Sequence, residues 1–326
     1  MSAPLPSNSR SASRSLAYLA LLVTFLIWSN SFIAVRALVG EDVPDAERLG
    51  PLELVEARFV PVALWCLGWF LLLPAARAEA RRILASHPLQ VLFLGLLSVW
   101  TYNLAFAVGH HRVPAGTGSL FTVLNPVLTF FLTVALGQER ATWLKVAGLA
   151  LAIVGLYTVV IHGSGRMVEP AYLRDALILV GAPASWSLCT TFSKPLVGRF
   201  SPLHLNFLVL GLASLPTLPL ALADRGFQAR VAAWTLPRYG AALFLALACT
   251  VLAFWLWYEA LQRLPASTAA AFVFLNAPMT VAFEWLWFGR VPRPVWWLGC
   301  AVVLAGVYLC TRDRDPLAEQ PRSARA

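Results

Sequence analysis

The chain has 326 residues, of which 59% are hydrophobic and 13% are charged, with a mean hydropathy of +0.70 and a net charge of +9. Soluble domains carry about 25% charged residues, so this composition excludes an ordinary soluble domain and indicates a protein embedded in a lipid bilayer. The positive charge does not indicate nucleic-acid binding, because Lys and Arg fall in the short segments between apolar stretches, where they orient membrane helices.

Ten apolar stretches follow one another, each near the ~20 residues that a helix needs to cross the hydrocarbon core. Backbone polar groups find no water partner in lipid, so helices are predicted rather than the shorter, alternating strands of a barrel. The Ser- and Pro-rich segment 1–15 and the charged segment 312–326 are expected to be disordered tails. The ten predicted transmembrane helices cover 16–36, 52–74, 89–109, 114–136, 143–162, 172–193, 203–223, 238–261, 266–288 and 294–311.

The first predicted helix carries a cluster of aromatic and polar side chains that recurs in the sixth. Trp28 corresponds to Trp186, and Arg36 corresponds to Lys194, in both cases 158 positions later. We expect the residues around the two tryptophans to form an aromatic and polar wall of a substrate site, made of Trp28, Asn30, Ser31, Trp186 and Thr190.

The second and third predicted helices contribute further polar groups. Arg58 lies about two turns inside the second helix, where it is either a snorkelling arginine satisfied by Glu53, Glu56 or headgroups, or part of a transport pathway. The third helix places Tyr102 and Asn103 together, which favours contact with protein or a cavity over contact with lipid. They are either interhelical hydrogen-bond groups or substrate contacts.

The fourth predicted helix carries Asn125, Thr129 and Thr133 at helical spacing, so these side chains form one polar stripe. A polar stripe facing lipid would be costly, so we expect it to face the protein interior. The positions 151 residues later, in the ninth helix, carry Asn276, Thr280 and Glu284.

A proline lies beside each of the two asparagines, at Pro126 and Pro278. Proline removes a backbone donor, and broken backbone inside a membrane is tolerated where it lines a cavity or is buried in protein. Two proline-kinked packing helices are the alternative. We predict that the two stripes contribute Asn125, Thr129, Asn276 and Thr280 to substrate binding, with Tyr102 and Asn103, and that Glu284 is a candidate proton carrier or a structural residue.

The two halves of the chain resemble each other over a long distance. The segment 112–157 corresponds to 263–308 at a constant offset of 151 positions, which indicates a duplicated unit. Each copy holds five predicted helices, and because five is odd the second copy must be inverted in the membrane. We therefore expect two inverted five-helix repeats, 16–162 and 172–311, with a substrate site near the midplane.

The distribution of positive charge predicts the orientation. With the N-terminus inside, the inner segments of the first half hold seven Lys and Arg residues and the outer segments hold three. Cytoplasmic loops carry an excess of these residues, so both termini are expected to be cytoplasmic.

At this point a family resemblance is evident, and it covers about 16–311. The tandem five-helix units and several short motifs resemble the EamA-type members of the drug/metabolite transporter superfamily. The resemblance implies a ten-helix basket of inverted repeats that moves small polar metabolites, often amino acids, outward across the plasma membrane, with the fifth and tenth helices at its periphery. The motifs that carry it are Trp28–Phe32, Arg58-Phe59, Asn125-Pro126, Gly137–Arg140 and Gly148 with Gly155–Tyr157.

We therefore predict a secondary transporter in the inner or plasma membrane that exports small polar metabolites such as amino acids by alternating access. A multidrug or other metabolite permease of the same fold remains an alternative, and a polytopic membrane enzyme is a weaker one, because the carboxylates are scattered singly. The expected partners are a small-molecule substrate and the lipid bilayer. No cofactor or metal is expected, because no phosphate-binding loop occurs and the five cysteines lie in apolar stretches.

Overall fold

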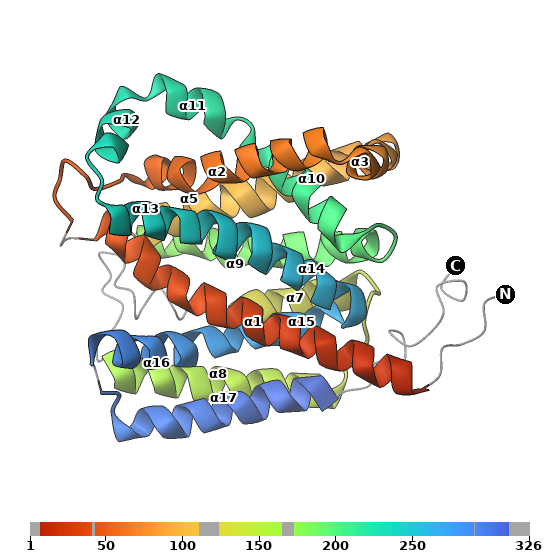
Figure 1. Ribbon diagram of the computed structural model, residues 1–326. Coiled ribbons are helices and arrows are strands. Elements are labelled where there is room, and N and C mark those ends of the chain that lie inside the picture. The colour runs from red at the N-terminus through yellow and green to blue at the C-terminus, as the bar shows by residue number, and fades with distance from the viewer. Residues whose placement is uncertain (1–6, 41–42, 111–123, 165–172, 290, 313–326) are drawn as a thin grey trace.

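The computed structural model describes residues 7–40, 43–110, 124–164, 173–289 and 291–312 (Figure 1). Every regular element in these ranges is a helix, which confirms the predicted all-α class. Seven helical segments in the described ranges are long and apolar enough to cross a membrane: Arg14–Val39, Pro51–Leu72, Pro88–Val108, Pro202–Ala223, Leu236–Arg263, Ala266–Trp287 and Pro294–Arg312.

The other three predicted spans overlap helices that are shorter or only partly described. These helices are α7 (Leu124–Ala135), α8 (Trp143–Ser164) and α9 (Leu173–Val197). Positions 114–123 of the fourth predicted span lie outside the described residues. The structure thus describes an all-α chain with several membrane-length helices, and the count of ten spans stays a prediction.

The helices at the ends of the chain differ in length from the predicted ones. Helix α1 (Ser7–Val39) begins within the segment predicted as an N-terminal tail, whereas α17 (Pro294–Arg312) ends where the C-terminal tail was expected. The Tyr18 hydroxyl lies 3.5 Å from the carbonyl of Thr311, so the start of α1 lies beside the end of α17. Along the chain between α1 and α17, the other regular α-helices include α2 (Pro51–Leu72), α3 (Pro74–Ser86), α10 (Pro202–Ser214), α11 (Thr217–Ala223) and α12 (Arg225–Ala232).

Two spans contain a π-helical segment, in which hydrogen bonds reach one residue further than in an α-helix. The third span runs through α4 (Pro88–Gly95), η1 (Leu96–Thr101) and α5 (Tyr102–His110). The eighth runs through α13 (Leu236–Leu243), η3 (Phe244–Leu252) and α14 (Ala253–Arg263). An offset of 151 positions carries η1 onto the second part of η3, so both halves of the chain contain this irregularity. Such segments frequently accompany functional sites.

The ninth predicted span is irregular just before Pro278, the proline that lies beside Asn276. It consists of α15 (Ala266–Ala271), the 3₁₀ segment η4 (Phe272–Leu275) and α16 (Asn276–Phe288). Pro278 has no amide hydrogen to donate to the carbonyl of Phe274, four residues earlier, so the regular α-helical pattern cannot pass through this point.

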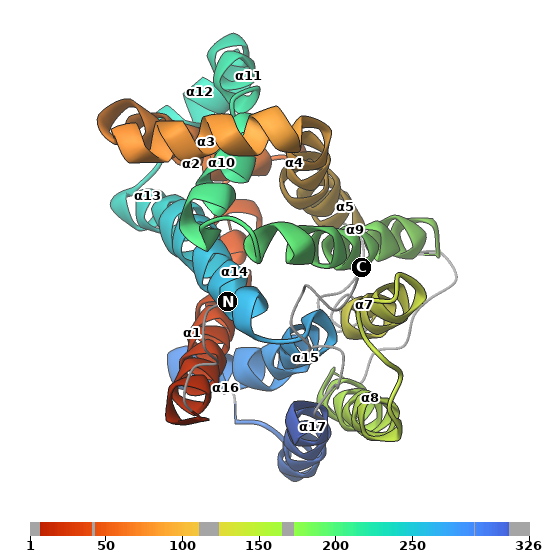
Figure 2. The ribbon, with the colours of Figure 1, turned by 90° about the vertical axis from the view of Figure 1, so that its right-hand side faces the viewer.

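Helices α8 and α17 pack antiparallel against each other at one side of the molecule (Figure 2). A side chain added at Gly306 would lie 2.6 Å from the carbonyl oxygen of Gly148, and one added at Gly155 would lie 2.9 Å from that of Gly299. Gly148 corresponds to Gly299, and Gly155 corresponds to Gly306, at the offset of 151. The contact of Gly148 with Gly306 thus corresponds, at this offset, to the contact of Gly299 with Gly155, and both require the absence of side chains.

Candidate functional site

A cavity lies at the centre of the helices, and both halves of the chain line it. Its volume, measured as the space open to the centres of water molecules, is about 100 Å³. Helices α1, α2, α5 and α7 contribute from the first half, and α9, η3, α14, η4 and α16 contribute from the second. Seven of the predicted site residues line this cavity: Trp28, Ser31, Tyr102, Asn103, Asn125, Trp186 and Asn276.

Aromatic rings form one wall of the cavity. The rings of Trp28 and Trp186, which are equivalent in the two copies, meet edge to face with centroids 5.3 Å apart. Phe254 lies 5.8 Å from Trp28 and 5.0 Å from Trp186, and Tyr102 lies 5.5 Å from Trp186. The indole of Trp28 donates to the carbonyl of Cys249 at 2.9 Å, which fixes its orientation. The wall offers apolar surface whose geometry is set by packing.

Each of the two asparagines lies against a serine of the other half of the chain. The hydroxyl of Ser29 lies 3.2 Å from Asn276 Oδ1, and the hydroxyl of Ser187 lies 2.9 Å from the backbone carbonyl of Asn125. Each hydroxyl also lies within hydrogen-bond distance of the carbonyl four residues earlier on its own helix. Ser29 and Ser187 are equivalent positions, separated by 158 residues. Asn125 Oδ1 is buried and has no hydrogen-bond partner among the described residues. A buried acceptor without a partner costs about 1–3 kcal/mol, so this amide has an open position for a donor.

Arg58 of α2 also lines the cavity, and two neutral side chains orient its guanidinium. Its Nε donates to Thr250 Oγ1 at 2.7 Å and its Nη1 donates to Asn103 Oδ1 at 3.1 Å. Asn103 in turn donates to the carbonyl of Ser98 at 3.0 Å, and Thr250 donates to that of Leu245 at 2.8 Å. Both carbonyls lie five residues earlier, within η1 and η3, so the π-helical segments help to hold the groups that orient Arg58.

One of the two alternatives for Arg58 was a pairing with Glu53 or Glu56, and the structure does not show it. Glu53 instead forms an ion pair with Arg230 at 2.7 Å and accepts from the backbone amide of Gly50 at 2.6 Å. Glu56 is buried, and its Oε2 has no hydrogen-bond partner in the described part of the chain. No carboxylate among the described residues lies within ion-pair distance of Arg58. The structure therefore places this arginine in the cavity rather than in a pairing with Glu53 or Glu56.

Two other predicted site residues lie away from the cavity lining. Asn30 is next to Ser31 on α1 but donates to the carbonyl of Leu26 at 2.9 Å, and it accepts from the indole of Trp287 at 3.3 Å. Thr280 donates to the carbonyl of Ser29 at 3.3 Å, which ties α16 to α1. The bond to Leu26 lies within α1, and the other two contacts join α1 to α16.

The remaining predicted residues divide into buried ones and ones that the structure does not describe. Thr129 on α7 and Thr190 on α9 are buried in protein, as is Thr133, so the described part of the stripe faces the interior as predicted. Neither Thr129 nor Thr190 lines the cavity. The side chain of Glu284 lies outside the described residues, so its proposed role stays a prediction.

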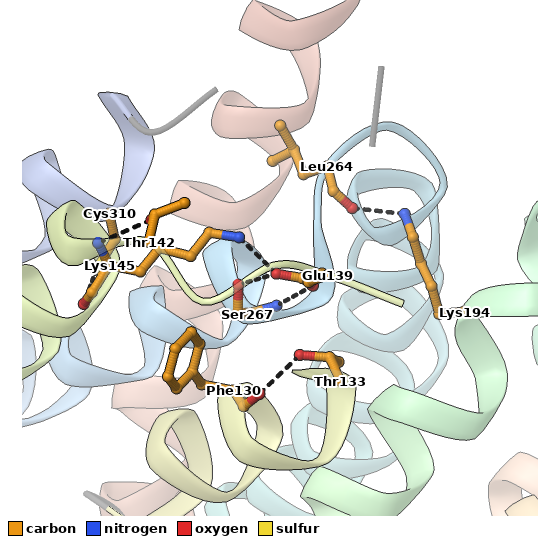
Figure 3. Close-up of polar contacts among 9 residues, drawn as sticks. All are labelled: Phe130, Thr133, Glu139, Thr142, Lys145, Lys194, Leu264, Ser267 and Cys310. Carbon is orange, nitrogen blue, oxygen red and sulfur yellow. Dashed lines mark hydrogen bonds and ion pairs between the residues drawn. The ribbon is translucent and has the colours of Figure 1, made fainter. Parts of the chain in front are cut away.

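A second polar cluster joins the two halves away from the cavity (Figure 3). Lys145 Nζ donates to Glu139 Oε2 at 2.7 Å, and both side chains are buried. Glu139 also accepts from the backbone amide of Ser267 at 3.0 Å and from its hydroxyl. Nearby, Lys194 donates to the carbonyl of Leu264 at 2.6 Å. The cluster fastens the α7–α8 connection to the first turn of α15, and the end of α9 to the segment between α14 and α15.

Several of these groups were not anticipated from the sequence. Thr250 is a lone polar residue in an apolar stretch, and this isolation is the one feature of the sequence that could have indicated a role for it. Lys145 and Glu139 are six positions apart and separated by a turn, so no helical spacing indicates their contact. Ser267 lies 128 residues beyond Glu139 and gives no local signal. Glu259 and Arg263, four residues apart on α14, form an ion pair at 2.5 Å.

Comparisons with known proteins identify the family of the chain and its relatives. Two segments of the chain, 15–161 and 174–312, match the EamA-like transporter family. A protein of Streptantibioticus cattleyicolor described as a probable terminal-alkyne amino-acid exporter is 27% identical, over 90% of this chain and 92% of its own. A probable amino-acid metabolite efflux pump of Salmonella typhimurium is 26% identical, over 91% and 95% respectively. A solved crystal structure shares the fold with a TM-score of 0.71 at 16% identity, covering 91% of this chain and 96% of that one.

Proposed function

The chain belongs to the EamA-like transporter family and is a multi-pass membrane transporter rather than an enzyme, and we propose that it exports small polar metabolites such as amino acids by alternating access. The observation that carries this proposal is the central cavity, which combines a cation, two amides and an aromatic wall. Such a lining suits a small solute with a polar or charged end and an apolar portion. Two relatives described as amino-acid exporters or efflux pumps support the same class of solute.

The proposed architecture is a pair of inverted five-helix repeats, 16–162 and 172–311, forming ten membrane spans. Three reciprocal contacts between equivalent residues support it. Trp28 meets its counterpart Trp186, each repeat's serine holds the other repeat's asparagine, and the glycines of α8 meet those of the antiparallel α17. A two-fold axis in the membrane plane would produce contacts of this kind, because it exchanges equivalent residues while reversing the helix direction.

The proposed site consists of the predicted residues that line the cavity, together with Arg58. Alternating access requires the cavity to open to each side of the membrane in turn. The cluster of Glu139, Lys145 and Ser267 joins the two repeats but does not line the cavity. We propose that it closes one side of the membrane in the described conformation.

The proposed orientation has both termini in the cytoplasm and predicts a labelling pattern. Asp45 and Ser86 are both exposed, and they lie at opposite ends of the helices, in the α1–α2 connection and at the end of α3 (Figure 1). In a chain without the five native cysteines, Asp45→Cys is expected to react with a membrane-impermeant maleimide in intact cells, whereas Ser86→Cys is expected to react only after lysis. The reverse pattern would show that the orientation is inverted.

Reconstituted protein provides the direct test of function. Proteoliposomes loaded with radiolabelled phenylalanine are expected to lose the label faster than protein-free liposomes, and unlabelled phenylalanine on the other side should accelerate the loss by exchange. Asn125→Ala is expected to slow exchange about tenfold or more at low substrate concentration, because a buried partner is lost. Flux of cationic drugs without flux of any amino acid would instead favour the alternative of a multidrug permease.

A further inference from the structure

Arg58 carries a positive charge at the centre of the molecule that the described protein does not neutralise. Its two hydrogen-bond partners, Thr250 and Asn103, are neutral, and no carboxylate among the described residues lies within ion-pair distance. A charge in a membrane protein is costly unless it is paired or faces a water-filled cavity. The cavity therefore provides space for an anionic group, and the unpaired charge of Arg58 would attract one.

The guanidinium still has donors to offer. It carries five N–H groups in a fixed planar fork. Nε uses one toward Thr250, and Nη1 uses one toward Asn103. The second hydrogen of Nη1 and both hydrogens of Nη2 have no partner among the described residues. These lie at the outer end of the fork, which is the edge that binds both oxygens of a carboxylate at once.

We propose that Arg58 is the specificity-determining residue of the cavity, and that it binds the carboxylate of the exported solute through Nη1 and Nη2. This inference rests on the proposed function and names the group that the site recognises. Thr250 and Asn103 are positioning residues, because they hold the guanidinium through Nε and one hydrogen of Nη1. Asn103 and Thr250 bond in turn to backbone carbonyls of the π-helical segments η1 and η3, so these segments help to orient Arg58.

The rest of the cavity defines the remainder of the solute. Asn125 Oδ1 is a buried acceptor without a partner among the described residues, so it suits an N–H or O–H donor. The rings of Trp28, Trp186 and Phe254 offer a surface for an apolar portion. The predicted solute class is a small carboxylic acid with an apolar portion, and a hydrogen-bond donor on that solute would add the contact with Asn125.

A structural role is the competing explanation, because Arg58 also joins α2 to α5 and η3. Loss of such a structural contact would lower the stability of the protein, and it would change the affinity for all solutes equally. Recognition of a carboxylate would instead affect acids and leave their neutral analogues unchanged. The ratio between the affinities for an acid and for its amide therefore separates the two roles, even where a variant is less stable.

The experiment measures the affinity of detergent-purified full-length protein for two matched pairs of probes by calorimetry. The pairs are phenylalanine with phenylalaninamide, and 3-phenylpropionate with 3-phenylpropionamide. Wild-type protein is expected to prefer each acid over its amide by about 10- to 100-fold, the range for hydrogen bonds to a charged group. Arg58→Gln is expected to lose that preference, and Arg58→Lys to keep part of it, because lysine retains the charge but not the fork.

Arg230→Gln is the matched control. It also removes an arginine, but one that pairs with Glu53 and does not line the cavity, so the preference for acids should persist. An unchanged acid-to-amide ratio in Arg58→Gln, or equal affinities for acid and amide in the wild type, would overturn the proposal. Selective binding of 3-phenylpropionate without flux of any amino acid would uphold Arg58 and reject amino-acid export. Absence of binding to all four probes would reject both.

Discussion

Replacing Gly306 with valine is expected to destabilise the protein by about 3 kcal/mol or more, at the upper end of the cost of overpacking. A Cβ atom at this position would lie 2.5 Å from the backbone nitrogen of Ala152 and 2.6 Å from the carbonyl oxygen of Gly148. Backbone atoms inside a helix cannot move aside as a flexible side chain can, so α8 and α17 would have to separate. In lipid, close packing across small residues is a main source of helix association, and valine would remove it.

The matched control is Gly68→Ala on α2, where an added Cβ meets no atom within 4 Å. This variant should change stability by no more than about 1 kcal/mol, and in the stabilising direction, because alanine favours helix. Thermal unfolding of both variants in the same detergent measures the difference. If the Gly306→Val protein unfolds at the same temperature as the wild type, the α8–α17 contact is not as tight as described.

Replacing Lys145 with methionine is expected to cost about 3–5 kcal/mol, because it leaves the carboxylate of Glu139 buried without its cation. The side chains of Lys145 and Glu139 are 1% and 4% exposed, so water cannot take the place of the missing ammonium group. Ser267 would still donate to the carboxylate, but it supplies no charge. The double variant Lys145→Met/Glu139→Gln should recover part of the loss, since it removes the unpaired charge as well.

Arg263→Met provides the control for a partly exposed ion pair. Arg263 and Glu259 are four residues apart on α14, and their side chains are 31% and 23% exposed. Pairs of this kind contribute about 0–1 kcal/mol, so this variant should melt close to the wild type. Equal losses in Lys145→Met and Arg263→Met, or no recovery in the double variant, would contradict the expectation that burial makes the Lys145–Glu139 pair important for stability.

The sequence by itself determined the class of fold, and it indicated a correspondence between the two halves. Length and hydrophobicity are local properties, and in lipid they leave the helix as the natural form of an apolar stretch of ~20 residues. Constant offsets paired Trp28 with Trp186 and Asn125 with Asn276 before any contact was known. Pro278 likewise marked the break in the ninth span, because a missing backbone donor acts on its own helix.

The tertiary structure alone decided which polar side chains meet in the cavity. Neighbouring residues on a helix point about 100° apart, and only the packing of α1 places Ser31 rather than Asn30 at the cavity lining. Spacing cannot show that Arg58 reaches Thr250, 192 positions away, instead of the nearby Glu53. Such contacts depend on how each helix is rotated against its neighbours, and that rotation is set by side-chain packing across the whole bundle rather than by the residues of one helix.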